Sequence, residues 1–319
     1  MTLNRFILLT PLVLAASLPS PAAASCGSAY CVINTQWDTQ GMASQAGRFM
    51  ADLRYEYIRQ DRLRRGGRDI SAAEDTADTT ETRTVNQNLV AGLDYTFDRH
   101  WGVAASLPMA KRQHDHIADP TGAATPESWQ FTRTGDARVL GRYQFDLEEP
   151  TNSVGLQFGL KLPTGGYRVA NGEGVVAERA LQPGTGSTDL VLGGYYAYRP
   201  QFRGLGWFGQ ALFQQAIATR EDFRPGNQLS ITGGINYPVS DEVTLLFQLN
   251  GLVKGRDTGS NAESDLSGGR HLYASPGVSF ALTPDSQLYG FVQQPLVRNV
   301  NGVQLVARQA LVVGLSLRF

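Results

Sequence analysis

The feature that most constrains the fold of this chain is an alternation of apolar and polar residues that recurs along its length. In the last nine residues, apolar side chains occupy every second position from Leu311 to Phe319, and the positions between are mostly small or polar. A period of two is typical of β-strands with one apolar and one mixed face. About twelve such segments predict strands: 49–57, 89–97, 101–109, 137–145, 154–162, 190–198, 207–219, 229–237, 243–253, 272–282, 287–298 and 311–319.

The connections between these segments alternate between long and short. Those after the first, third, fifth and ninth segments are long and polar, whereas those after the even-numbered segments are short. This rhythm is typical of bacterial outer-membrane barrels, which have long extracellular loops and short periplasmic turns. We therefore predict an all-β fold: a transmembrane antiparallel up-and-down β-barrel of about twelve strands, with both termini in the periplasm.

The start of the chain predicts export. Arg5, an apolar run over 6–16 and the small residues of 22–24 form the pattern of a secretory signal peptide. We expect 1–24 to be that peptide, 25–47 to be a periplasmic segment or a plug in the barrel lumen, and 48–319 to be the barrel. The expected location is the bacterial outer membrane.

Two short motifs lie near the ends of the mature chain. Cys26 and Cys31 are expected to form a disulfide in an oxidising compartment, with metal binding by the pair or lipidation of Cys26 as alternatives. At the other end, Leu315, Leu317 and Phe319 resemble the C-terminal assembly signal of outer-membrane barrels. The barrel-assembly machinery is therefore an expected partner.

Charged residues fall on the predicted lumen face of the strands, with both signs interleaved. They either pair into a filling that stabilises the barrel or meet water along a conduction path. Lys161 and Asp189 are expected to form an ion pair that pins the loop between them, and this loop is a candidate to fold inward. The predicted lumen charges are Asp52, Arg54, Glu56, Asp94, Asp136, Arg138, Arg142, Lys161, Asp189, Lys254 and Arg308.

His114 and His116 are the candidate metal ligands. Two imidazoles at i and i+2 of a strand share a face and can ligate one copper or zinc ion. The alternative is that both histidines lie in a solvated loop, because the sequence shows no third ligand. No histidine has an evident outward-facing serine partner, so we predict no enzyme activity, no catalytic residue and no cofactor.

Charge narrows the range of partners. The net charge of −1 argues against a nucleic-acid-binding protein, which would carry a basic face. The first long connection is rich in arginine and is predicted either to hold lipopolysaccharide phosphates or to be a solvated loop. Outer-membrane lipid, lipopolysaccharide and a small-molecule solute are the other expected partners. The arginines are Arg59, Arg62, Arg64, Arg65 and Arg68.

Three segments carry a resemblance to a known family. They are Gly135-Asp136, the sequence GLKLPTG at 159–165 and the sequence LQPGTGSTD at 181–189. In these segments the chain resembles the outer-membrane transporter family first associated with phenol meta-cleavage pathways, which is similar in outline to long-chain fatty-acid channels. The resemblance implies an outer-membrane channel or transporter for small solutes, hydrophobic ones included. The alternative is a non-conducting barrel with a structural or a copper- or zinc-handling role.

Overall fold

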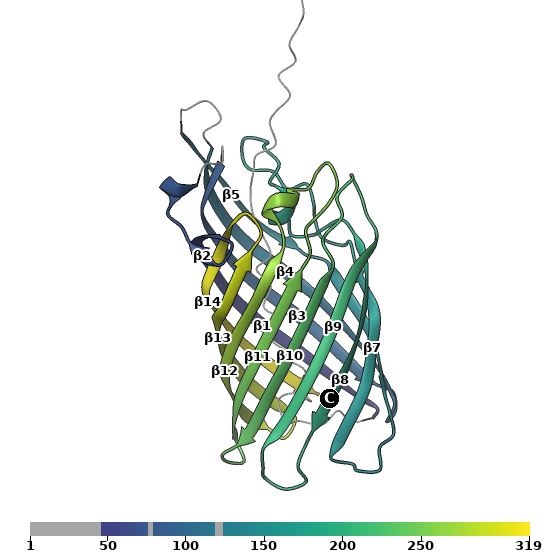
Figure 1. The fold of residues 1–319 in the computed structure, drawn as a ribbon. Helices are drawn as coiled ribbons and strands as arrows, with labels where there is room; N and C mark the ends of the chain where they lie inside the picture. Colours follow the sequence, from purple (N-terminus) through teal and green to yellow (C-terminus); the bar gives the residue numbers. More distant parts are fainter. Residues whose placement is uncertain (1–45, 76–78, 119–123) are drawn as a thin grey trace, which may run out of the picture.

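A computed structural model describes residues 46–75, 79–118 and 124–319 of the chain. Its strands form one antiparallel sheet that closes through the pairing of β1 with β14 (Figure 1). Within the described ranges, no helix is long and apolar enough to cross a membrane. The strands are β1 (Arg48–Arg65), β2 (Arg68–Asp69), β3 (Thr79–Thr96), β4 (Trp101–Ala118), β5 (Thr125–Thr134), β6 (Ala137–Gln144), β7 (Asn152–Leu162), β8 (Thr188–Tyr198), β9 (Gly206–Ala218), β10 (Gln228–Pro238), β11 (Val243–Lys254), β12 (Gly269–Thr283), β13 (Ser286–Val300) and β14 (Val303–Arg318).

The wall of the barrel has twelve strands, as predicted. Both β5 and β6 pair with β4, so they form one wall strand that is interrupted at Gly135 and Asp136. The two-residue β2 pairs only with the end of β1 and lies in the connection to β3. Short 3-10 helices occur in the same connection, η2 (Ala72–Glu74), and in two others, η3 (Arg179–Leu181) and η4 (Ser264–Leu266).

The alternation in the sequence separates an apolar outer wall from a polar interior. On β1, Leu53 and Tyr55 are exposed, while Glu56 and Gln60 are buried. The same inversion recurs on β11, where Leu249 is exposed and Asn250 is fully buried. A soluble protein buries its large apolar side chains, whereas a barrel in a bilayer turns them towards lipid. The fold is therefore that of a transmembrane barrel.

The last strand closes the barrel against the first, as predicted from the ending of the sequence. Backbone N–H groups of Phe49 and Phe319 donate to each other's carbonyl oxygen at 2.9 Å, and the two rings stack with centroids 5.8 Å apart. Inside this seam, the hydroxyls of Tyr289 and Ser316 donate to one carboxylate oxygen of Asp52 at 2.9 and 2.8 Å. Strands β13, β14 and β1 are thus joined by side chains as well as by backbone.

The two ends of the barrel differ, and we call them the turn end and the loop end. The turn end carries the C-terminus and the connections 97–100, 145–151, 199–205, 239–242 and 284–285; the loop end carries the others. The prediction of long loops after the first and third segments is wrong in part. Much of that polar sequence is strand, because β1, β3 and β4 each run for 18 residues and rise beyond the apolar belt with β5 (Figure 1).

Candidate functional site

The barrel encloses a cavity of about 380 Å³, lined by inner-facing side chains of β1, β3, β4 and β6–β11. Residues of the β7–β8 connection, among them Arg179 and Gln182, line it from the loop end. Val90, Leu140 and Leu212 provide apolar surface between charged and amide groups. Such a lining can contact both the apolar and the polar parts of a small molecule.

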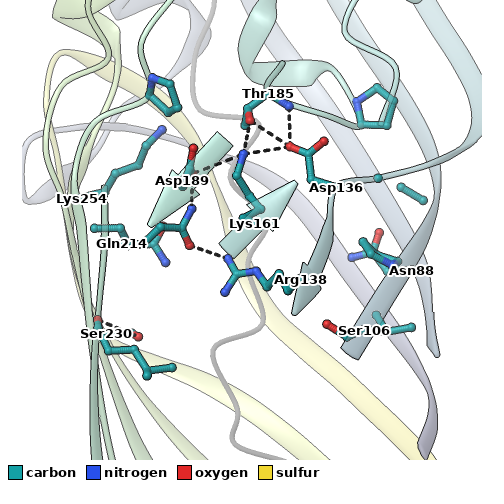
Figure 2. Close-up of a pocket in the computed structure, with 18 of the residues that line it drawn as sticks. Asn88, Ser106, Asp136, Arg138, Lys161, Thr185, Asp189, Gln214, Ser230 and Lys254 are labelled. Atoms are coloured by element: carbon teal, nitrogen blue, oxygen red, sulfur yellow. Dashed lines mark hydrogen bonds and ion pairs between the residues drawn. The ribbon is translucent and has the colours of Figure 1, made fainter. Parts of the chain in front are cut away.

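The ammonium group of Lys161 is the centre of the polar wall of this cavity (Figure 2). Its Nζ lies 2.9 Å from a carboxylate oxygen of Asp136, 3.3 Å from one of Asp189 and 3.1 Å from the hydroxyl of Ser187. All three charged side chains are buried, so each charge depends on the others for compensation. The predicted Lys161–Asp189 pair is present, and Asp136 is a further partner that we did not predict.

The three segments that carry the family resemblance meet at this cluster. Asp136 accepts the backbone N–H of Gly165 at 3.0 Å and that of Thr185 at 2.9 Å. The backbones at Gly135, Gly165 and Gly184 touch, because a Cβ added to Gly184 would lie 2.6 Å from the carbonyl of Gly165. The glycines therefore allow close backbone approach, while the aspartate and lysine hold the segments together.

Glutamines extend the network along the cavity wall. Gln214 on β9 donates to Asp189 at 2.5 Å and accepts from the guanidinium of Arg138 at 2.7 Å (Figure 2). Gln210 donates in the same way to Gln157 on β7 at 2.5 Å. Sequence reasoning did not place Gln210 and Gln214 on the inner face, because apolar and polar residues do not alternate regularly over 207–219. The inner position of Gln157 follows from the alternation along its own strand. For the glutamines of β9, the missing information was the pairing of β9 with β8.

Most other predicted lumen charges also lie on the inner face and pair there. On β1, Arg54 lies 2.7 Å from Glu56 and 3.9 Å from Asp52. Arg142 and Asp94 pair at 3.2 Å near the turn end. At the loop end, Lys254 pairs at 2.9 Å with Asp257, a residue outside our prediction.

Arg308 does not join this set, and its predicted lumen position is wrong. Its side chain is 57% exposed and pairs with Asp61 at 2.9 Å, next to the outward-facing Arg59. The cause is a double slip of the β1–β14 ladder at this point, which the period-two extrapolation could not detect.

The connection between β7 and β8 folds into the barrel, as the sequence suggested. The indole N–H of Trp129 on β5 donates to the carbonyl of Val175 at 2.9 Å, and Arg112 on β4 donates to the carbonyl of Leu181. Leu181 is buried against Trp129 and Ala177. This connection, which we call the inward loop (163–187), narrows the loop end of the lumen.

His114 and His116 lie on β4 and are buried, so the alternative of a solvated loop is wrong. Their rings approach at 3.4 Å between Nε2 of His114 and Nδ1 of His116. Thr84 bonds the other nitrogen of His114 at 2.8 Å, and Glu127 bonds that of His116 at 3.1 Å. In the described ranges, no group of three or more His, Cys, Asp or Glu side chains is arranged to hold a metal ion. Metal binding by the two histidines stays a prediction.

Several predicted features lie outside the described residues. They are the signal peptide, the disulfide of Cys26 and Cys31, and the plug or periplasmic segment up to residue 45. The side chains of the predicted assembly signal are placed: Leu317 and Phe319 are exposed on the outer wall, at the strand that closes the barrel. Leu315 lies on the same face of β14, opposite Leu53 of β1. Their role in assembly stays a prediction.

Comparison with solved structures finds similar barrels. The COG4313 outer membrane channel from Pseudomonas putida F1 is 15% identical, with a TM-score of 0.63 over 87% of this chain and 97% of that one. The NanC porin is 12% identical, with a TM-score of 0.48 over 84% and 98% of the two chains. No protein-family model and no curated protein sequence matches this chain. The first likeness confirms the predicted β-barrel fold.

Proposed function

We propose that this chain is a bacterial outer-membrane channel that passes small solutes through the barrel lumen. The observation that carries the proposal is the cavity of about 380 Å³ inside a closed barrel with an apolar outer wall. Its lining of paired charges, amides and aliphatic side chains suits solutes that combine polar and apolar groups. The similar barrel from P. putida, which is named as an outer membrane channel, supports the same function.

The geometry favours a narrow passage over a wide pore. A twelve-strand barrel is narrower than the sixteen-strand porins, and the inward loop occupies part of its loop end. Charges of both signs line the cavity and most of them are paired. The lining is therefore polar enough to contact water but carries no strong net charge. We therefore propose passage of single small molecules instead of bulk flow.

Conductance of the full chain in planar lipid bilayers tests the proposal. We expect small, discrete current steps, and faster swelling of proteoliposomes in small sugars or aromatic acids than in larger oligosaccharides. Removing 170–176 from the tip of the inward loop is expected to enlarge the steps. Absence of both current and swelling with the full chain and with the shortened loop would contradict a channel. It would favour the non-conducting alternative.

A further inference from the structure

The ladder between β1 and β14 slips twice just above the apolar belt. Arg59 pairs with Gln309, Gln60 pairs with Ala307, and Arg62 pairs with Val306, so that residues 61 and 308 have no cross-strand partner. In an unbroken register Arg308 would share the inner face of β14 with Ala310, since residues two apart point the same way. The bulge instead places Arg308 beside Arg59 on the outer wall.

One carboxylate holds both arginines in place. Nε of Arg59 lies 3.0 Å from one oxygen of Asp61, and Nε of Arg308 lies 2.9 Å from the other. Asp61 is only 13% exposed, whereas the arginine side chains are 54% and 57% exposed. The Nη groups of both guanidinium ions have no other partner among the described residues, and the trio has a net charge of +1.

The trio lies at the boundary between the apolar belt and the polar wall above it. Tyr57 and Leu311, which pair across the same seam, are the adjacent outward residues towards the membrane. On the neighbouring strands, the exposed Lys111 lies at the level of Tyr57, and Arg83 pairs with Asp115. Cations therefore lie where a lipid in the outer leaflet has its head group, with apolar surface directly below them.

We propose that this outer face of β1 and β14 binds the phosphate groups of lipid A, the membrane anchor of lipopolysaccharide. A guanidinium ion matches phosphate with two parallel N–H···O bonds, and the orientation of both arginines by Asp61 lowers the cost of that contact. The acyl chains lie against Tyr57, Leu311 and the belt below them. The proposal rests on the proposed outer-membrane location but not on conductance.

Binding of diphosphoryl lipid A to the full chain in nanodiscs, followed by native mass spectrometry, tests this site. We expect R59Q/R308Q to weaken binding roughly tenfold or more, since two charge-assisted contacts are lost. Binding of dephosphorylated lipid A is expected to be the same for the wild type and for R59Q/R308Q. The matched control is R203Q, because Arg203 is equally exposed and ion-paired with Asp241 but lies at the turn end. It should leave lipid A binding intact.

Three outcomes would overturn the proposal. They are equal binding of diphosphoryl lipid A by the wild type and R59Q/R308Q, an equal loss in R203Q, and full competition by millimolar inorganic phosphate. A shift between unboiled and boiled samples on a gel shows that each variant is folded. If R59Q/R308Q does not fold, R59K/R308K keeps both charges and is expected to lose the bidentate part of the affinity. A chain that binds lipid A without conducting would contradict the proposed channel alone.

Discussion

Among single residues, Lys161 has the greatest influence on the polar wall of the lumen. It is buried between Asp136 and Asp189, and both carboxylates lose their compensating charge if it is removed. We expect Lys161→Met to lower the free energy of unfolding by about 3–5 kcal/mol, the range for breaking a buried ion pair. Denaturant unfolding in detergent micelles, followed by tryptophan fluorescence, measures the effect.

An exposed ion pair provides the control for this experiment. Arg203→Met removes a pair with Asp241 at the surface of the turn end, where such pairs contribute about 0–1 kcal/mol. Equal unfolding midpoints for the wild type and Lys161→Met would show that water compensates the two aspartates. The cluster would then have little role in stability.

The facing of single residues could be predicted where the strands are regular. Lys161 and Asp189 follow the period of two, and their pairing across β7 and β8 was within reach of the sequence. Arg308 follows the same period in the sequence but not in the structure, because a bulge changes the parity of the strand. A bulge depends on the partner strand and leaves no mark in the pattern of a single strand.

Among the connecting elements, the inward loop depends on close backbone contact at its base. A Cβ at Gly184 would lie 2.6 Å from both the carbonyl carbon and the oxygen of Gly165. We therefore expect Gly184→Ala to displace the base of the loop at a cost of about 1–3 kcal/mol, as for overpacking. The readouts are larger current steps and faster cleavage of the loop by added protease.

Gly172 gives a matched control in the same loop. Nothing lies within 4 Å of a Cβ at this exposed position, so Gly172→Ala should leave current and cleavage unchanged. If Gly184→Ala behaves like this control, the contact between the three glycine segments does not hold the loop in place.

We expect the packing of the inward loop to depend on pH through Glu178. Both of its carboxylate oxygens are buried without a hydrogen-bond partner in the described structure. Burial, and then the nearby Glu263, Glu81 and Glu127, raise the pKa of Glu178 well above its ordinary value. The cations of the adjoining elements are engaged elsewhere: Arg179 pairs with Glu221, and Arg112 donates to Asn86 and to the loop backbone.

The sign follows from the raised pKa. A group that is harder to ionise in the packed loop leaves that packing unopposed below its ordinary pKa, and opposes it increasingly as pH rises towards the raised value. We expect the current through the full chain to grow as pH rises above about 4, the ordinary pKa of a glutamate, because the loop then loosens. Glu178→Gln removes the ionisable group and should abolish this growth.

Glu173 lies exposed in the same loop and serves as the comparison. Glu173→Gln should keep the pH dependence of the full chain. A pH dependence that survives unchanged in Glu178→Gln would assign it to another group.

The strands were easier to predict than the height of the wall they build. Apolar alternation marks a strand only where its outer face meets lipid, so it stops at the edge of the belt. The polar ends of β1, β3 and β4 continue as strands because each still has a pairing partner: β14 for β1, β4 for β3, and both β3 and β5 for β4. The inward loop was only a candidate in the sequence, because its buried contacts with Trp129 and Arg112 come from strands distant in sequence.

For the whole molecule, the closed barrel follows from the repetition of one local pattern. Each segment alone could belong to a soluble sheet, but a dozen of them with alternating connections require a wall with one apolar side. Closure could be predicted because a barrel leaves no free edge strand, so the last segment had to meet the first. The arrangement of polar side chains in the lumen depends on contacts between residues of different strands. Their pairing, as in Arg138 with Gln214, is set by strand order and register and not by local sequence.

The apolar outer wall itself has a direct test through the tryptophans. Trp101 and Trp207 are exposed on the belt near the turn end, whereas Trp129 is buried inside the barrel. In variants that keep a single tryptophan, we expect brominated lipids to quench the fluorescence of Trp101 and Trp207 strongly, because their rings contact acyl chains or the interface. Trp129 is the internal control and should be quenched little in the same bilayers. Equal quenching at all three positions would mean that the barrel is not inserted with this wall facing lipid.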